Sequence, residues 1–208
     1  MKPDEFLAFY ERQRASAILR TSREDVAKLA MEAAIRGGFR ICEFTLTVPR
    51  AYDLIRKFAA GDGVVVGAGT VLTVDEARQA VAAGARFLVS PVIDEAVIEE
   101  AERLNVAMMP GTHTPTEMLR AYRAGAPLQK LFPAPGIGPA YVKACLGPMP
   151  FLRLVPTHGV DATNARAYLD AGAFALGFVA PLFDADDLAH ERYDAIEQRA
   201  RGLLGALA

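Results

Sequence analysis

Short apolar runs alternate with longer amphipathic stretches along the whole chain. Eight of these runs are rich in Val, Ile, Leu and Phe and have the length of buried strands. They are Ala15–Arg20, Arg40–Leu46, Val64–Thr70, Phe87–Pro91, Val106–Gly111, Leu128–Pro133, Phe151–Thr157 and Ala173–Ala180. Buried strands separated by helical stretches predict right-handed βαβ units and a parallel sheet.

The stretches between these strands have helical periodicity and recurring end signals. Helices are predicted over Arg23–Arg36, Val74–Ala83, Glu95–Leu104, Pro115–Ala124 and Ala162–Ala171. Thr21 or Ser22, Thr73, Asp94 and Asp161 are suited to cap their N-termini. Four of the predicted helices end on a phrase whose glycine suits a left-handed C-cap, namely Gly37-Gly38-Phe39, Ala83-Gly84-Ala85, Ala124-Gly125-Ala126 and Ala171-Gly172-Ala173. We interpret this repeat as architecture rather than chemistry.

Eight such units close naturally into a barrel, so we expect an α/β protein with a single (β/α)₈ TIM barrel domain over residues 1–208. Pro3–Arg14 predicts an extra N-terminal helix before the first strand, and Asp186–Leu204 predicts a closing helix. The alternative is a doubly wound open sheet. Arg20-Thr21-Ser22-Arg23 follows the first strand in place of a Gly-rich dinucleotide turn, which disfavours that alternative.

Composition and charge exclude several classes of partner. The 208 residues are 52% apolar with a formal net charge of -2, which indicates a compact domain without the basic field that attracts nucleic acid or an anionic membrane. No apolar run is long enough to span a bilayer, and the charged segment Met1–Arg14 lacks the apolar centre of a signal peptide. We therefore expect a cytoplasmic protein, with Cys42 and Cys145 as buried thiols.

One lysine and one carboxylate fall inside predicted strands. Of five lysines, Lys130 alone lies in a strand, and of 25 acidic residues, Glu43 alone lies in a strand core. Alternation puts Glu43, Thr45 and Thr47 toward the barrel interior. Burial lowers the pKa of an amine toward neutrality, and a neutral amine can attack a ketone. A structural ion pair between Lys130 and Glu43 is the competing interpretation, since such pairs also perturb pKa values.

Polar residues follow several of the predicted strands, at the barrel end where active sites are built. They are Arg20, Thr47, Thr70, Ser90, Gly111-Thr112-His113 and Thr157-His158-Gly159. A ring of such hydrogen-bond donors suits a small ligand that carries a carboxylate. Each residue alone is weak evidence, because Ser and Thr also serve as helix caps. No carboxylate-rich ligand spacing predicts a metal, so we expect no cofactor.

At these residues the chain resembles the family of 2-keto-3-deoxy-6-phosphogluconate (KDPG) and 4-hydroxy-2-oxoglutarate (KHG) aldolases. The matching pieces stand in order over nearly the whole chain. They are Ala17-Ile18-Leu19-Arg20, Glu43-Phe44-Thr45-Leu46, Val66-Gly67-Ala68-Gly69-Thr70-Val71-Leu72, Ser90-Pro91, Pro110-Gly111, Lys130-Leu131-Phe132-Pro133-Ala134, Gly138-Pro139-Ala140-Tyr141-Val142-Lys143-Ala144 and Pro156-Thr157. Their order and spacing together are specific, although no single piece is.

The resemblance implies a metal-free (β/α)₈ barrel, usually a homotrimer, that cleaves a 2-keto-4-hydroxy acid into pyruvate and an aldehyde. Lys130 matches the Schiff-base lysine and Glu43 the general acid/base. Thr70 matches a residue that holds the pyruvyl carboxylate, and Arg20 a substrate-binding arginine of the galactonate branch. The substrate-binding positions implied in all are Arg20, Thr47, Thr70, Pro91, Gly111, Thr157, His158, Gly159 and Gly177.

Three positions depart from the family pattern. Thr47 stands where the family has an arginine, His158-Gly159 replaces Gly-Gly, and Gly177-Phe178-Val179-Ala180-Pro181 replaces a Gly-Ser phosphate loop. Thr47 leaves one carboxylate contact missing, for which Arg50 or Arg20 can compensate. Phosphate sites in barrels use open backbone amides and hydroxyls at a helix N-terminus, so the change in the last of these loops predicts a substrate without a terminal phosphate. His113 and His158 are either binders of a second carboxylate or hydroxyl, or simple loop residues.

Three hypotheses for function follow. The first is a class I aldolase for a non-phosphorylated 2-keto acid, and the second is an aldolase of the phosphorylated sugar acid with a rearranged phosphate site. The third is a non-catalytic barrel that binds a keto acid or serves in an assembly.

Overall fold

The computed structural model of the protein describes residues 1–134 and 136–207, and every predicted strand forms within them. The strands are β1 (Ala15–Leu19), β2 (Ile41–Thr45), β3 (Val65–Gly69), β4 (Phe87–Val89), β5 (Ala107–Met109), β6 (Gly111–Thr112), β7 (Gln129–Leu131), β8 (Leu154–Pro156) and β9 (Leu176–Phe178). The predicted fifth strand is divided in two because Pro110, which has no N–H, interrupts it. The carbonyl of Pro110 still accepts a hydrogen bond from the amide of Lys130 at 3.0 Å.

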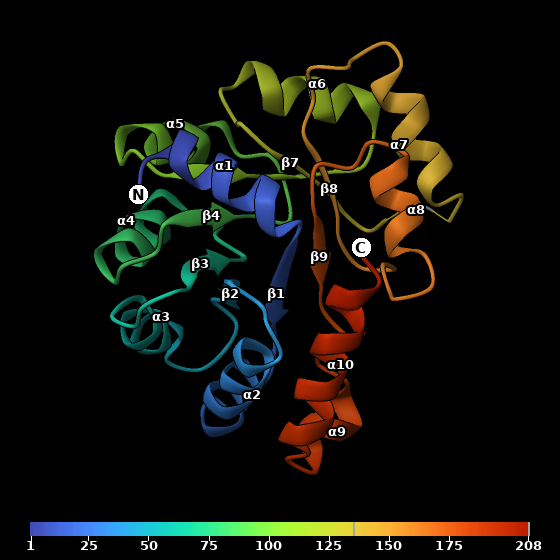
Figure 1. Ribbon diagram of the computed structural model, residues 1–208. Helices are drawn as coiled ribbons and strands as arrows, with labels where there is room; N and C mark the ends of the chain where they lie inside the picture. Colours follow the sequence, from blue (N-terminus) through green and yellow to red (C-terminus); the bar gives the residue numbers. More distant parts are fainter. Residues whose placement is uncertain (135, 208) are drawn as a thin grey trace.

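All the strand pairs are parallel, as the βαβ pattern predicts. One sheet has the order β5-β4-β3-β2-β1-β9 and the other has the order β6-β7-β8. A parallel bridge between Thr157 and Gly177 connects the end of β8 to β9, and β5 and β6 are consecutive in the chain. The result is an α/β fold with a curled parallel sheet, and Figure 1 shows the helices arranged around the outside of its strands.

The helices surround this sheet, with α1 across one end of it and the others against its outer face. They are α1 (Pro3–Gln13), α2 (Glu24–Arg36), α3 (Ala51–Ala59), α4 (Val74–Ala82), α5 (Glu95–Arg103), α6 (Pro115–Arg123), α7 (Pro139–Leu146), α8 (Ala165–Asp170), α9 (Ala185–Ala189) and α10 (Tyr193–Gly205). None of the helices in the described part of the chain has the length and apolarity needed to cross a membrane.

The predicted N-caps are correct at two helices. Thr73 accepts from the amide of Glu76, and Asp94 accepts from two amides of α5. The prediction is wrong at α2, whose N-cap is Arg23, because Thr21 instead accepts from the amide of Arg23 in the preceding turn. Asp161 caps a turn rather than a helix, and α8 therefore begins three residues later than predicted, at Ala165.

The central glycine of each repeated three-residue motif has the left-handed conformation predicted for it. Gly38, Gly84, Gly125 and Gly172 have φ values of +117°, +110°, +96° and +99°. In each case the amide of the following residue bonds back into the last helical turn, as in Phe39 N–H to the Ala34 carbonyl at 3.1 Å. These contacts are the Schellman arrangement, so the repeat sets how each helix returns to its next strand.

The predicted closing helix is two helices instead of one. Glu191, with φ +56°, separates α9 from α10. The break lets the nearly buried Asp187 of α9 pair with Arg192 at 2.7 Å and with Arg199 of α10. An ion pair at this corner therefore replaces a straight helical connection.

Two groups of buried side chains make up the core. The larger lies between the sheet and the helices, and includes Cys42 and Phe44 of β2. The smaller fills the interior at the N-terminal ends of the strands, and α1 supplies Phe6 and Tyr10 to it. The Phe6 ring stacks on Phe87 with centroids 4.7 Å apart. Helix α1 thus closes the end of the sheet opposite the loops that follow the strands.

Tyr10 carries a polar group into this interior and pairs it there. Its hydroxyl lies 2.8 Å from the hydroxyl of Ser16, and both residues are fully buried. Burial raises the pKa of Tyr10, so the phenol stays protonated at neutral pH.

We expect Tyr10→Phe to lower the free energy of unfolding by about 1 kcal/mol, because the Ser16 hydroxyl loses its buried partner. Urea unfolding is the measurement, with Ser16→Ala and the double variant completing a thermodynamic cycle. Equal and additive losses from the two single variants would contradict a direct bond between the hydroxyls.

Candidate active site

The inward-facing residues of β2 are those that alternation predicts. Cys42 and Phe44 pack in the core between the sheet and the helices, whereas Glu43 lies inside and is fully buried. Thr45 is also buried, and its hydroxyl lies 2.8 Å from that of Thr47 and donates to the Leu19 carbonyl at 3.2 Å. The inward face of β2 is therefore polar toward the C-terminal end of the strand.

The Glu43 side chain occupies space that a glycine of the neighbouring strand leaves open. A Cβ atom built on Gly69 would lie 1.9 Å from Glu43 Oε1. Neither carboxyl oxygen of Glu43 has a hydrogen-bond partner among the residues that the structure describes. The group is held by shape rather than by hydrogen bonds, so no hydrogen bond within the described residues competes for its oxygens.

Burial raises the pKa of Glu43 above its ordinary value, and the positive charges of Lys130 and Arg20 oppose this rise. An apolar enclosure disfavours the ionised form of a carboxyl group. A carboxyl whose pKa is raised toward neutrality can both take up and return a proton, which suits general acid/base chemistry.

Lys130 is the buried amine predicted from the sequence. It lies in β7 with 7% of its surface exposed, and its Nζ is 4.9 Å from the centroid of the Phe132 ring. Its backbone is fixed on both sides of the strand, since its amide donates to Pro110 and its carbonyl accepts from the Thr112 hydroxyl. A rigid strand therefore positions the amine.

Burial lowers the pKa of Lys130, the charge of Glu43 opposes this, and the charge of Arg20 adds to it. The ion pairs found among the described residues, with N–O distances up to 4.0 Å, do not include one between Lys130 and Glu43. The structural ion-pair interpretation is therefore not supported. The two groups affect each other's pKa without direct contact, as a substrate bound between them would require.

Several predicted binding residues lie in the loops that follow these strands. Arg20 is exposed directly after β1, and Thr47 is exposed after β2. Thr70 follows β3 with φ +60°. Arg20 is close enough to act electrostatically on both Glu43 and Lys130. For Thr47 and Thr70 the structure gives a position at the same end of the sheet but no contact with the buried pair.

The loop after β8 is linked to Lys130 through an aromatic ring. His158 is exposed with φ +64°, and its ring meets Phe132 edge-on with centroids 6.0 Å apart. The same Phe132 ring lies against Lys130 Nζ. Gly159 follows with φ +87°, and the Thr157 hydroxyl is turned to the Val155 carbonyl at 3.3 Å. His158 and Lys130 thus contact the same aromatic ring.

Two glycines of the predicted site have a packing role. A Cβ on Gly177 would lie 2.6 Å from the Thr157 hydroxyl, and one on Gly111 would lie 2.1 Å from the carbonyl oxygen of Pro91. Both positions require a missing side chain because backbone and side chains of neighbouring strands approach closely there. The close approach of neighbouring strands is enough to explain glycine at both positions, independently of any role in binding.

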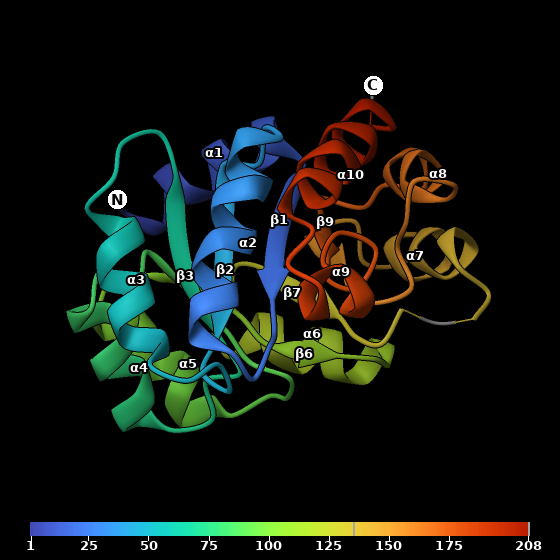
Figure 2. The same cartoon turned by 90° about the horizontal axis from the view of Figure 1, so that it is seen from below.

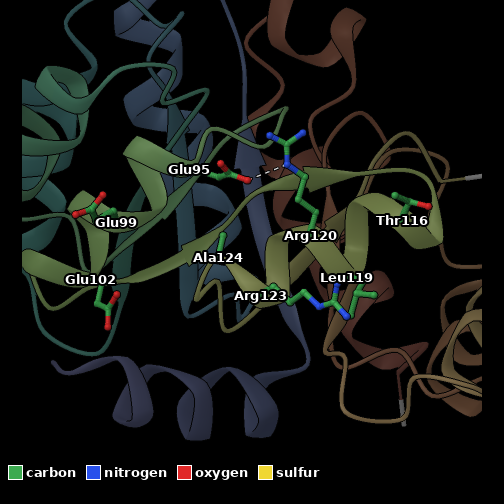
Figure 3. Close-up of a pocket in the computed structure, with 8 residues that line it drawn as sticks. All are labelled: Glu95, Glu99, Glu102, Thr116, Leu119, Arg120, Arg123 and Ala124. Atoms are coloured by element: carbon green, nitrogen blue, oxygen red, sulfur yellow. Dashed lines mark hydrogen bonds and ion pairs between the residues drawn. The ribbon is translucent and has the colours of Figure 1, made fainter.

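A pocket of about 260 Å³ opens beside Phe132. Its lining includes Pro91, Gly111, Thr112 and His113. His113 Nδ1 lies 3.0 Å from the Pro133 carbonyl, which turns that nitrogen away from a ligand. A second pocket, of about 600 Å³, lies outside the sheet between α5 and α6, where Glu95 pairs with Arg120 at 2.9 Å (Figure 3). Neither lining includes Lys130 or Glu43, but the smaller pocket borders Phe132, whose ring lies against Lys130 Nζ, so we place the chemistry on that side.

Sequence reasoning missed two residues on which this geometry depends. Phe132 contacts Lys130, and its place two residues further along the same strand face was a usable signal. Gly69 makes room for Glu43, and only the register that pairs Thr45 with Gly69 reveals it. In the described part of the chain, no three His, Cys, Asp or Glu side chains lie close enough to hold a metal ion.

Comparison with known proteins identifies the family of this chain. The family model for KDPG and KHG aldolase matches residues 9–199, and the chain therefore belongs to that family, whose members are carbon–carbon lyases. A 2-dehydro-3-deoxy-phosphogluconate aldolase of Treponema pallidum (strain Nichols) is 39% identical over 164 residues, covering 76% of this chain and 77% of that protein.

Solved structures have the same fold. The native KDPGal structure is 30% identical with a TM-score of 0.84, covering 92% of this chain and 93% of that one. KDPG aldolase from Legionella pneumophila, with pyruvate captured at low pH as a covalent carbinolamine intermediate, has a TM-score of 0.86 at 24% identity. The alignment with it covers 95% of this chain and 97% of that one, and at this identity it shows the fold alone.

We expect Gly69→Ala to reduce the kcat of carbon–carbon cleavage by about 100-fold or more. The fold should be retained, because the new Cβ has only to displace the Glu43 carboxyl. Steady-state kinetics with circular dichroism is the measurement. Gly61→Ala is the matched control, since a Cβ there meets only the Phe58 carbonyl at 3.5 Å. Unchanged kcat in Gly69→Ala would show that the position of this carboxyl is unimportant.

We expect Glu43→Gln to raise the free energy of unfolding near pH 7 by roughly 1 kcal/mol, because it removes a buried ionisable group without a partner. Since burial raises the pKa of Glu43 in the folded state, its cost to stability grows as pH rises above the unfolded pKa. The gain should therefore shrink as the pH is lowered toward about 4.

Denaturant unfolding at several pH values is the measurement. Glu117→Gln is the control of opposite sign, because backbone amides of Thr114 and His113 lower the pKa of Glu117. That variant should lose stability near neutral pH and approach the parent protein in acid. A loss of stability in Glu43→Gln at neutral pH would contradict the assignment of Glu43 as a strained functional group.

Proposed function

We propose that this protein is a class I aldolase that cleaves a 2-keto-4-hydroxy acid to pyruvate and an aldehyde through a Schiff base on Lys130. The observation that carries the proposal is a strand-borne, buried amine whose pKa is lowered, beside a buried carboxyl that it does not contact. Membership of an aldolase family supports the reaction class.

The lowered pKa of Lys130 provides the neutral amine that attacks the C2 carbonyl of the substrate. Loss of water from the resulting carbinolamine gives a protonated imine, which withdraws electrons from C3. Glu43 takes the proton from the C4 hydroxyl, directly or through water, as the C3–C4 bond breaks and the aldehyde leaves. The electron pair of that bond passes to the imine, which becomes an enamine.

Glu43 then returns its proton to C3 of the enamine, and water hydrolyses the pyruvyl imine to release pyruvate. Raising the pKa of Glu43 serves both steps, because the same group must accept a proton and then donate it. The interior between Glu43 and Lys130 on one side and α1 on the other is filled by apolar side chains, so water does not reach the reaction from the α1 end of the sheet.

For the substrate carboxylate we propose Arg20 and Thr70 as the binding residues, with Thr47 beside them. Arg20 is the cation whose charge reaches both catalytic candidates. We propose that Pro91, Gly111, Thr157, His158, Gly159 and Gly177 form the remaining wall of the site.

We further propose that the chain is a single (β/α)₈ barrel domain in which α1 is an extra helix that closes the bottom. The Thr157–Gly177 bridge between β8 and β9 and the continuity of β5 with β6 support closure of the curled sheet. The docking of Phe6 and Tyr10 among interior residues supports the role of α1.

We propose a homotrimer, located in the cytoplasm where pyruvate is metabolised. Three large apolar side chains are exposed on loops after strands, Leu72, Val92 and Ile137, and these suit an interface between copies. Sedimentation equilibrium should give the mass of three chains, and a mass of one chain at micromolar concentration would refute the trimer.

Borohydride reduction in the presence of pyruvate should leave a reduced pyruvyl adduct on Lys130, identified by peptide mass mapping. Lys130→Ala should give no adduct and lose carbon–carbon cleavage by about 10⁴-fold or more. Because the pKa of Lys130 is lowered, trapping should be efficient near neutral pH and fall as the amine protonates in acid.

Lys143→Ala is the matched control, because Lys143 is exposed on α7 and should not react with pyruvate. This variant should still form the adduct on Lys130. A folded protein that forms no adduct on Lys130 would refute the aldolase proposal. The non-catalytic keto-acid-binding barrel would then become the better hypothesis.

A further inference from the structure

His113 is an exposed residue that three other parts of the chain hold in place. Its amide donates to the Glu117 carboxylate of α6 at 2.8 Å, and its carbonyl accepts from the Tyr141 hydroxyl of α7 at 2.7 Å. Its ring nitrogen Nδ1 lies 3.0 Å from the carbonyl oxygen of Pro133 in the loop after β7. Exposed side chains ordinarily exchange rotamers freely, so this degree of fixation indicates a defined role for the residue.

The contacts of His113 also define the state of its ring. The Pro133 carbonyl can only accept a hydrogen bond, so Nδ1 carries the proton that is donated to it. The Tyr141 ring stacks on the imidazole with centroids 6.3 Å apart and planes inclined by 24°. None of these contacts uses Nε2, the second ring nitrogen. The side chain therefore acts on the protein through Nδ1.

The hydrogen bond from His113 reaches the residue that directly follows Phe132. Helix α6 packs against β6 and β7 (Figure 2), so the loop that carries His113 lies beside the end of β7. The Phe132 amide donates to the Thr112 carbonyl at 3.0 Å, and the Ala134 amide donates to two carbonyl groups directly after β8 at 3.1 and 3.2 Å. The backbone around Phe132 is thus held from the β6 side and from the β8 side.

Phe132 is the side chain that connects this loop to the amine. Its ring centroid lies 4.9 Å from Lys130 Nζ. Phe132 lines the pocket of about 260 Å³, as His113 does, whereas Lys130 does not. The ring therefore contributes to the low exposure of the amine, and its position depends on the backbone to which His113 is bonded.

We propose that His113 is a positioning residue for imine formation, because its bond from Nδ1 to the Pro133 carbonyl holds the Phe132 ring against Lys130. The proposal rests on the aldolase function proposed above. In this role His113 acts through Phe132 rather than on the substrate. It is therefore neither of the two roles that the sequence left open, a ligand-binding residue or a simple loop residue.

A looser Phe132 ring should change the chemistry of the amine. Burial is the largest cause of the lowered pKa of Lys130, so water that reaches Nζ should return this pKa toward its ordinary value. The loss of cation–π attraction acts in the opposite direction, and we expect burial to dominate because it is the largest cause. More of Lys130 is then protonated near pH 7, and attack on a ketone slows.

The test measures imine formation with pyruvate as a function of pH, by borohydride trapping after fixed times and peptide mass mapping. In His113→Ala we expect the rate near pH 7 to fall by about threefold to tenfold, which corresponds to the loss of one hydrogen bond. The midpoint of the pH dependence should move to higher pH. An unchanged rate and midpoint in His113→Ala that circular dichroism shows to be folded would overturn the proposal.

Two further variants separate the bond at Nδ1 from other functions of the ring. The side-chain amide of His113→Asn lies close to the position of Nδ1 and can donate to the Pro133 carbonyl, so this variant should retain the midpoint of the parent protein. The amide of His113→Gln lies further out, near the position of Nε2, and this variant should resemble His113→Ala. The reverse result would indicate direct contact of Nε2 with bound pyruvate and would exclude the positioning role.

His190→Ala is the matched control. His190 is also exposed, and its Nδ1 also lies 3.0 Å from a backbone carbonyl, that of Asp186, but it follows α9. The rate and the midpoint should be unchanged in this variant. A shift equal to that of His113→Ala would show that the effect does not depend on Phe132, which would refute the proposal.

Trapping in the parent protein separates the two levels of the argument. An adduct on Lys130 in the parent, with no change in His113→Ala, would refute only the positioning role. Absence of any adduct in the folded parent protein would refute the aldolase function itself.

Discussion

Enclosing an amine and a carboxyl group in one apolar interior is the constraint to which the rest of this molecule responds. An isolated buried charge is costly, and the ordinary remedy is a close ion pair. Here Lys130 and Glu43 are kept apart, so each is left with a shifted pKa. The remaining stability must come from elsewhere, and the apolar layers on both faces of the sheet supply it. The shifted pKa values that make Lys130 and Glu43 reactive are thus a direct result of leaving the two buried groups unpaired.

Strand β3 shows how the interior is divided between packing and chemistry. Its two inward glycines leave space for different neighbours, since a Cβ on Gly67 would meet the Phe87 ring at 2.5 Å and one on Gly69 would meet Glu43. The space beside Gly67 is filled by the Phe87 ring, which stacks on Phe6 of α1. The space beside Gly69 is filled by the Glu43 carboxyl. Strand β3 therefore contacts the end closed by α1 through Gly67 and the candidate active site through Gly69.

The short apolar runs were sufficient to predict the eight strand regions, and alternation was sufficient to predict the inward direction of Glu43. The burial of Lys130 was predicted because it is the only lysine that falls in a predicted strand. The break at Pro110 follows from the missing N–H but was not predicted, since the flanking residues are uniformly apolar. The division of the last helix at Glu191 depends on the Asp187–Arg192–Arg199 contacts, which join residues distant along the helix. Gly69 and Phe132 required strand register and side-chain proximity, which a single sequence does not provide.

The position of α1 has a consequence for how the chain is made. Phe6 and Tyr10 leave the ribosome well before two of their neighbours, Phe87 and Phe174, and the ring of Phe174 meets Tyr10 edge-on with centroids 6.2 Å apart. The helix cannot reach its final place until a late part of the sequence has been synthesised. Until then the apolar face of α1 remains without its native partners, so docking of this helix during translation must wait for the synthesis of the strand region that contains Phe174.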